Sequence, residues 1–164
     1  MVTAASVSVA AIYYVMTLRA QQTNMKHALE TRQTQVFMNF FDRFNDRQLM
    51  KAWNSVTMDM KYRDYDEFLE KYGWEKNPDF YINFDLIGWT FHGMGVLVKK
   101  NQIDPELVTE LSGAGIISYW EKSKPFYVEW RRRYIPTAYW GIDYLYDKVK
   151  KIYSEKHSEI IQPQ

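Results

Sequence analysis

The sequence contains no cysteine, which excludes disulfide bonds, thiolate metal sites and a cysteine nucleophile. It also lacks an excess of either charge, because 21 Lys and Arg residues stand against 20 Asp and Glu residues. With a formal net charge of +1, the chain has no overall field that would attract nucleic acid. No stretch shows strand alternation beside hairpin turns, and no internal repeat is visible, so the sequence predicts an all-α fold.

The N-terminal stretch 2–18 lacks charge and ends at Arg19. Its apolar run is about one bilayer crossing long, at the short end of the roughly 17 to 25 residues usually needed. A cleaved signal peptide is the alternative, but no positive residue precedes the apolar run and only Ala20 follows it as a small residue. We therefore expect residues 1–18 to form an uncleaved transmembrane anchor.

The positive residues near this segment all follow it, beginning with Arg19, Lys26 and Arg32. The positive-inside rule then predicts a single-pass protein of the cell membrane, with its N-terminus outside and its main domain cytoplasmic. Small residues four apart can let a second membrane helix approach closely. This gives a candidate membrane-partner face at Ala4, Ser6, Ser8 and Ala10.

No proline or glycine interrupts the stretch 19–44, and its apolar residues become increasingly helical in spacing. We expect the anchor to continue as one long helix. Its polar part, 19–35, is a helical stalk. A cytoplasmic helical domain then covers 36–157, and 158–164 is a loose tail without a pattern. The expected architecture is a compact bundle of about six or seven helices.

Caps and periodic apolar residues divide the domain into helices. Asp46 and Asp64 are expected to cap two short helices, with Gly73 ending the second in a left-handed conformation. Asn77 before Pro78 starts a helix that is apolar on most of its circumference. Asp104 before Pro105 starts another, which the stretch 112–115 either breaks or opens to a neighbouring helix. A last helix is expected over about 137–157.

Five glycines are interpreted as helix-packing positions. Each glycine in a helix interior costs roughly 1 kcal/mol relative to alanine, so a run of them calls for a reason such as close approach of another helix. These positions are Gly88, Gly93, Gly95, Gly113 and Gly115.

Several stretches resemble a family of small prokaryotic, membrane-anchored helical proteins that is known only as a domain of unknown function. They are 32–38, 42–46, 93–100, 103–108 and 116–122, and the likeness covers roughly 32–150. The resemblance implies a helical fold with one N-terminal membrane helix. Its motifs are helix and turn patterns, and they imply no catalytic residue.

The residues that could carry chemistry do not form a known constellation. His27, His92 and His157 fall on three different predicted helices, so paired bundle metal motifs are missing, and neither a metal site nor a cofactor is expected. The glycines at 93–95 and 112–115 lack the rest of a phosphate-binding motif. Weak pocket candidates are His92, Trp89 and Trp120 among the aromatic helices.

Basic and aromatic residues interleave at 130–134 and 148–153, where they could contact anionic lipid or a phosphate backbone. In a neutral chain tethered to a bilayer, lipid or protein is the expected partner and nucleic acid is not. The sequence therefore predicts a non-enzymatic accessory or interaction subunit that holds another membrane protein subunit, or a second copy, at the membrane. A ligand-binding or enzymatic domain around His92 is the alternative.

Overall fold

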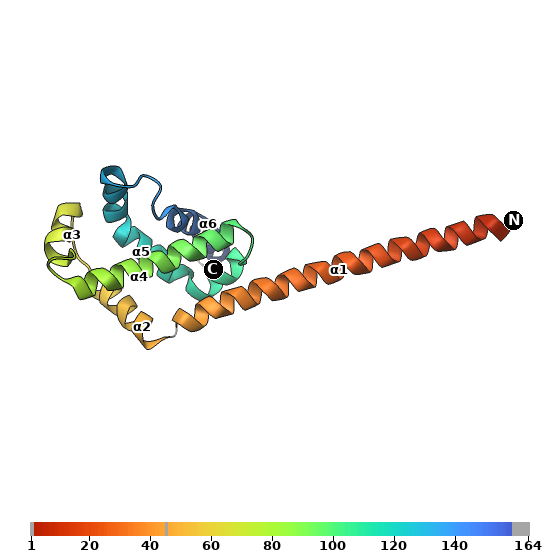
Figure 1. The fold of residues 1–164 in the computed structure, drawn as a ribbon, viewed down its shortest axis with the longest axis horizontal. Helices are drawn as coiled ribbons and strands as arrows, with labels where there is room; N and C mark the ends of the chain where they lie inside the picture. The colour runs from red at the N-terminus through yellow and green to blue at the C-terminus, as the bar shows by residue number, and fades with distance from the viewer. Residues whose placement is uncertain (1, 45, 159–164) are drawn as a thin grey trace.

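The computed structural model describes residues 2–44 and 46–158, and the side chains of these residues except 2–6, 43, 44, 157 and 158. In the described part of the chain there are six α-helices, one π-helical turn and no strand. The all-α prediction is therefore confirmed. A long N-terminal helix leads into a bundle built from the remaining elements (Figure 1).

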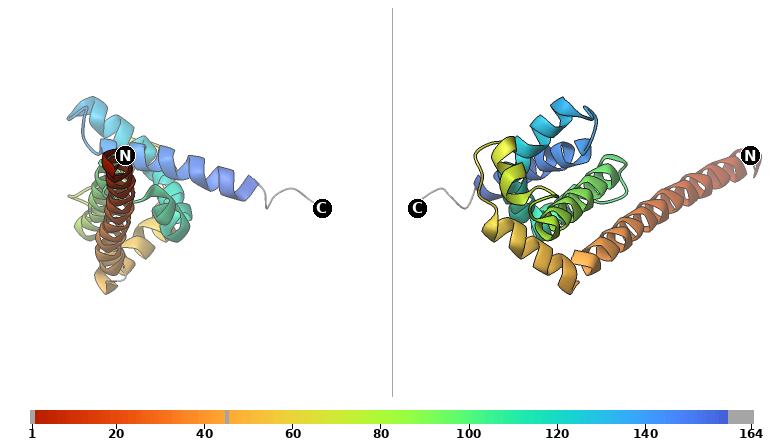
Figure 2. Two further views of the ribbon diagram at one scale, coloured as in Figure 1. Left: turned by 90° about the vertical axis from the view of Figure 1, so that its right-hand side faces the viewer. Right: turned by 60° about the vertical axis from the view of Figure 1, so that its left-hand side comes forward.

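Helix α1 (Val2–Phe44) is continuous over 43 residues, as expected from the lack of proline and glycine. At about 1.5 Å per residue it is about 65 Å long. Most of it projects away from the bundle, as Figure 1 and the right-hand view of Figure 2 show. Only its C-terminal part joins the core, where Phe37 is completely buried and the Gln33 Nε2 donates to the Asn101 carbonyl at 2.8 Å.

The hydropathy of the helices does not support the predicted transmembrane anchor. None of the helices, searched over the described residues, is both long enough and apolar enough to span a bilayer. The physical reason is composition, because Ser8, two tyrosines and Thr17 dilute the apolar side chains, and Arg19 and two glutamines follow directly.

The next elements are short and begin at side-chain caps. Asp46 accepts from the Gln48 N–H at the start of α2 (Arg47–Asn54), which runs into the π-helical turn η1 (Ser55–Asp59). Asp64 accepts from the Glu67 N–H at the start of α3 (Tyr65–Tyr72). Gly73 follows α3 with φ −61° and ψ 157°, so the expected left-handed conformation is wrong. Glycine fits this position for another reason. A Cβ atom here would collide with the Leu69 carbonyl oxygen.

Helices α4 and α5 form the centre of the bundle. Asn77 caps α4 (Pro78–Lys99), and Asp104 caps α5 (Pro105–Arg133), each with proline in the first turn as predicted. Asn101 takes the left-handed φ of 53° in the corner between them. The small residues 112–115 do not break α5, since Gly113 packs against Val149 and Tyr153 of the last helix.

Helix α6 (Trp140–Ser158) lies against both α4 and α5 and completes the bundle. It begins three residues later than expected, because 135–139 form a turn between α5 and α6. Tyr139, the last residue before α6, has a φ of 55°, which is rare for a bulky side chain. Its position is fixed by aromatic contacts described below.

The core is largely aromatic. Phe68 of α3 lies with its ring centroid 4.8 Å from that of Phe84 and 4.5 Å from that of Phe126. Deeper in the bundle, the Tyr119 hydroxyl donates to the Phe84 carbonyl and is 2.8 Å from the Tyr127 hydroxyl. Burial raises the pKa of both tyrosines well above its ordinary value, so both hydroxyls stay protonated and hydrogen-bonded.

Candidate interaction surfaces

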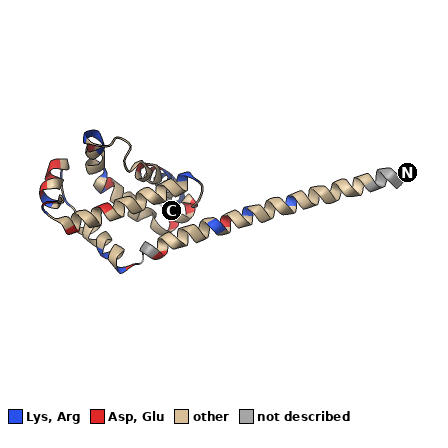
Figure 3. Ribbon diagram, viewed as in Figure 1, with Lys and Arg blue, Asp and Glu red and all other residues tan. Residues whose placement is uncertain are grey.

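The N-terminal part of α1 exposes large apolar side chains that no other described residue covers. Val7 is 69% exposed and Tyr13 is 73% exposed. No charged residue interrupts the described helix before Arg19 (Figure 3). The exposed apolar residues are Val7, Val9, Ile12, Tyr13, Tyr14, Val15, Met16 and Leu18. We call them the apolar end of α1.

The candidate membrane-partner face lies on the same part of the helix. The side chains of Ala4 and Ser6 lie outside the described residues. Ser8 and Ala10 are exposed on α1. The helix around them extends away from the bundle (Figure 1).

The five predicted packing glycines lie in different surroundings. A side chain at Gly88 would collide with the Tyr127 hydroxyl, and one at Gly95 would collide with the Gly141 carbonyl on α6. At Gly115 the nearest atoms are those of the Trp53 indole, at 3.2 Å. Gly113 has the contacts given above. Gly93 is the exception, since a side chain there would meet only the Phe40 ring at an ordinary 3.9 Å.

His92 sits at the junction of α4 and α6. Its Nδ1 accepts a hydrogen bond from the Gly141 N–H at 3.1 Å, which satisfies a backbone donor in the first turn of α6. Burial, and then the charge of Arg131, lower the pKa of His92 below its ordinary value of 6.5. The neutral imidazole with Nδ1 as acceptor is therefore the form that the fold holds, and His92 has a structural role.

Trp89 and Trp120, the other two pocket candidates, lie in different surroundings in the described structure. The Trp89 ring lies 5.7 Å from the His92 ring and is largely exposed. Trp120 is buried and stacks on Tyr127, at a centroid distance of 6.0 Å. Trp89 instead lines a groove of about 680 Å³ together with Gly93 and side chains of α1 and α2, and neither His92 nor Trp120 lines it.

Tyr139 lies next to both Trp89 and His92, although the sequence did not indicate it as a site residue. Its hydroxyl donates to the Asp85 carboxylate, and its carbonyl accepts from Arg131 at 3.3 Å. Its ring lies 5.1 Å from Trp89 and 6.0 Å from His92. Burial, and then the Asp85 carboxylate, raise the pKa of Tyr139 well above its ordinary value. The unusual backbone of Tyr139 is thus held from several sides.

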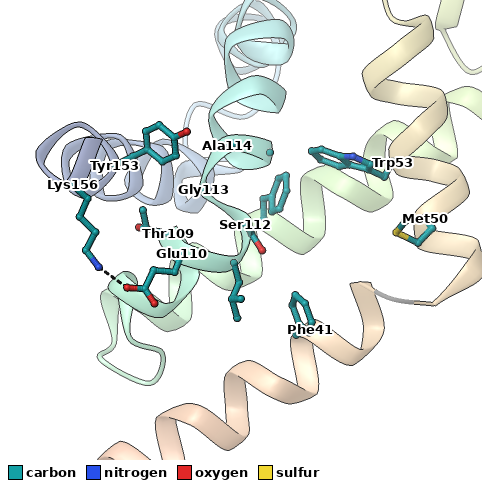
Figure 4. Close-up of a pocket in the computed structure, with 13 residues that line it drawn as sticks. Phe41, Met50, Trp53, Thr109, Glu110, Ser112, Gly113, Ala114, Tyr153 and Lys156 are labelled. Carbon is teal, nitrogen blue, oxygen red and sulfur yellow. Dashed lines mark hydrogen bonds and ion pairs between the residues drawn. The ribbon is translucent and has the colours of Figure 1, made fainter. Parts of the chain in front are cut away.

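A second groove, of about 590 Å³, opens between α1, α2, α5 and α6. Its floor is the small-residue stretch 112–115 of α5, and Phe41, Met50 and Trp53 form one wall (Figure 4). The polar residues at its other side include Glu110 and Lys156, whose Oε1 and Nζ are 2.6 Å apart. The groove can accept an apolar group, and it presents neither a nucleophile beside a base nor a pair of facing carboxylates.

The basic patches predicted from the sequence are largely neutralised by carboxylates. Arg132 and Arg133 both bind Glu129, and Arg131 binds Asp143 at 2.5 Å. Lys150 is 3.2 Å from Glu121. Within the described residues there is no group of three or more His, Asp or Glu side chains that could hold a metal ion.

A family model described as Domain of unknown function (DUF4760) matches residues 1–149. The chain belongs to the DUF4760 family. The match includes α1 as well as the bundle, so it extends further towards the N-terminus than the stretches that carried the resemblance. No curated protein and no solved structure matches the chain.

The DUF4760 chain also contains features that sequence reasoning missed. The contact between Gly95 and Gly141 brings the backbones of α4 and α6 together, and only the first of these glycines was predicted to pack. A lone glycine inside the helical pattern of 140–153 is a signal that could have identified Gly141. Nothing in the local sequence indicates the positive φ of Tyr139, since it depends on contacts with residues far away in the chain.

Proposed function

We propose that this DUF4760 protein is a non-enzymatic accessory subunit that holds a partner at a membrane. The apolar end of α1 enters the bilayer, the polar part of α1 serves as a stalk, and the bundle carries the partner-binding surfaces. The observation that carries the proposal is the exposure of the apolar end, which projects from the bundle and is not covered by the other described residues.

The distribution of these side chains supports insertion end-on. At 3.6 residues per turn, the apolar side chains from Val7 to Leu18 point to all sides of the helix. A helix lying flat on a membrane surface needs one polar face, and this segment has none that is continuous. Apolar side chains on every side of a helix favour an apolar environment around it.

The charges support one orientation. Arg19, Lys26 and Arg32 follow the apolar end, on the side of the bundle. Since positive residues near a crossing remain in the cytoplasm, the proposal puts the bundle in the cytoplasm and the N-terminus outside. The segment 2–18 is about 25 Å long at 1.5 Å per residue, so the bilayer would thin locally or the flanking Arg19 side chain would reach towards the head groups.

The engagement of the polar groups supports a non-enzymatic role. His92 holds the start of α6, Asp85 holds the Tyr139 hydroxyl, and the Arg residues at the end of α5 are paired with carboxylates. Each of these groups has a structural partner. The bundle therefore offers surfaces for binding a partner, and these include the two grooves of about 590 and 680 Å³ described above.

Membrane extraction tests the proposal. In cells that express the full chain, the wild-type protein is expected to stay with membranes during an alkaline wash. The double variant Val9→Asp and Ile12→Asp is expected to move into the wash, because each central Asp costs roughly 2.5 to 3.5 kcal/mol in a membrane helix.

The matched control has the same two charges at the same spacing on the stalk, Gln21→Asp and Asn24→Asp. It is expected to stay with the membranes. Circular dichroism of all three purified proteins checks that the bundle is folded. Release of the wild type by the wash would contradict the proposal.

The alternative is a ligand-binding helical domain near His92, Trp89 and Trp120. The observation in its favour is the left-handed Tyr139, since strained backbone often marks a functional site. This alternative predicts a small molecule that co-purifies with the wild type in native mass spectrometry and is lost from His92→Ala. A wild-type protein without such a molecule would remove it.

A further inference from the structure

One face of α1 carries a row of residues that are spaced alternately three and four positions apart. We call this row the seam. From Val15 to Leu29 the members are separated by three, four, three and four residues. All of them are exposed, including Met25 at 73% and Leu29 at 49%. The seam consists of Ala11, Val15, Leu18, Gln22, Met25 and Leu29, and it ends before Arg32.

An average spacing of 3.5 residues is the repeat of a left-handed coiled coil. In heptad terms, Val15, Gln22 and Leu29 occupy the a positions, while Leu18 and Met25 occupy the d positions. A β-branched residue at a with leucine at d favours two strands, and a polar residue at a single a position fixes register. Val15, Leu18 and Gln22 meet these conditions, while the other two positions hold apolar residues without this preference, Leu29 at a and Met25 at d.

We propose that two copies of this chain associate through α1 as a parallel, in-register coiled coil along this seam. A second copy is the occupant because the seam is self-complementary: each Gln22 amide faces its counterpart, and apolar residues face apolar residues. An antiparallel pair would instead place the apolar end of one helix against the polar stalk of the other.

The flanking positions agree with a parallel pair. In this register the e and g positions of the two helices place Tyr14 near Arg19 and Gln21 near Lys26. These pairs combine a cation with an aromatic ring or an amide, so no like charges oppose each other across the seam. Lys26 also lies 3.8 Å from Glu30 of its own helix, which pairs its charge within the same chain.

The bundle leaves room for the second helix. The residues of α1 that bind the bundle include Gln33 and Phe37, and Phe41 stacks on Phe37. All three residues follow Leu29 along α1, so these bundle contacts lie beyond the end of the seam.

The inference does not rest on the membrane placement, because Gln22, Met25 and Leu29 all lie beyond Arg19 in the stalk. Within the apolar end, the small Ala11 continues the same seam. Small residues at a helix contact also favour close packing in lipid. One continuous seam would thus serve in water and in the membrane.

Cysteine cross-linking of the full chain in mild detergent tests the seam, since the chain has no cysteine of its own. Leu18→Cys and Met25→Cys are each expected to form a covalent dimer under a glutathione redox buffer. His27→Cys, on the opposite side of the helix, is the matched control. The seam variants should form the disulfide about tenfold faster, because only their Cβ atoms can reach bonding distance.

Two results would overturn the proposal. Equal cross-linking of all three variants would show collisions without a specific face. Cross-linking of Met25→Cys without Leu18→Cys would show an antiparallel pair, in which Met25 can meet its counterpart and Leu18 cannot. Loss of the dimer together with retained membrane binding would leave the proposed function standing, so the two failures are distinguishable.

Discussion

At the scale of single residues, Gly93 and Gly95 allow the effect of helix–helix packing on stability to be measured separately from that of helix propensity. Both lie in α4 two positions apart, but a side chain at Gly95 would enter the Gly141 backbone of α6. Backbone cannot move aside as a flexible side chain can, so Gly95→Ala is expected to destabilise the fold by roughly 2 to 3 kcal/mol. Chemical denaturation followed by circular dichroism measures the loss.

Gly93→Ala is the control for this prediction. The new methyl group would meet only the Phe40 ring at van der Waals distance, and alanine favours the helix. The variant is expected to unfold at the same denaturant concentration as the wild type or to gain up to about 1 kcal/mol. Equal losses for both variants would contradict the assigned contact between α4 and α6.

His92 makes the stability of the bundle depend on pH. Its pKa is lowered in the folded state by burial and by Arg131, so the unfolded chain binds the proton more readily. The contribution to the free energy of unfolding is complete above pH 6.5 and is lost as the pH falls through the lowered pKa. Thermal unfolding of the wild type is therefore expected at lower temperature at pH 5 than at pH 7.5.

His92→Asn checks the cause, because the amide oxygen can accept from the Gly141 N–H but cannot be protonated in this range. Its unfolding temperature should depend less on pH than that of the wild type. His27→Asn, a substitution of an exposed histidine on the stalk, should keep the wild-type dependence. A full pH dependence in His92→Asn would assign the effect to another group.

At the scale of elements, α1 consists of a part that the bundle needs and a part that it does not. Phe37 is completely buried, whereas the side chains of 20–32 are exposed. Removal of residues 1–29 is expected to change the unfolding free energy of the bundle by less than about 1 kcal/mol.

Phe37→Ala in the full chain should instead cost about 3 to 5 kcal/mol, because it removes a ring from the core. Urea unfolding of both proteins makes the comparison. A truncated protein that no longer unfolds cooperatively would show that the bundle depends on the exposed part of α1.

The sequence predicted elements well where a local signal was strong. Asn77 and Pro78, and Asp104 and Pro105, marked the starts of α4 and α5 correctly. The stretch 112–115 left two outcomes open, because glycine weakens a helix and also lets a neighbour approach. In the structure α5 is continuous, and Gly113 contacts α6. These contacts with a distant part of the chain cannot be predicted from the stretch 112–115 alone.

At the scale of the whole molecule, the predicted all-α fold is confirmed, while the arrangement of the functional groups was not predictable. In the sequence, His92, Trp89 and Trp120 each lie near other aromatic residues. In the fold, His92 binds α6, Trp89 faces a groove and Trp120 is in the core. The neighbours that separate them come from α6 and the turn before it, which are distant in the chain.

The unbroken course of α1 has a consequence for any partner that the bundle meets. A helix without a hinge transmits rotation, so each inserted residue would swing the bundle by about 100° and raise it by about 1.5 Å. Seven inserted alanines would restore nearly the same azimuth at a height greater by about 10 Å, whereas four would do so less well. The length of α1 therefore sets both the direction and the distance of the bundle relative to the N-terminal end of the helix.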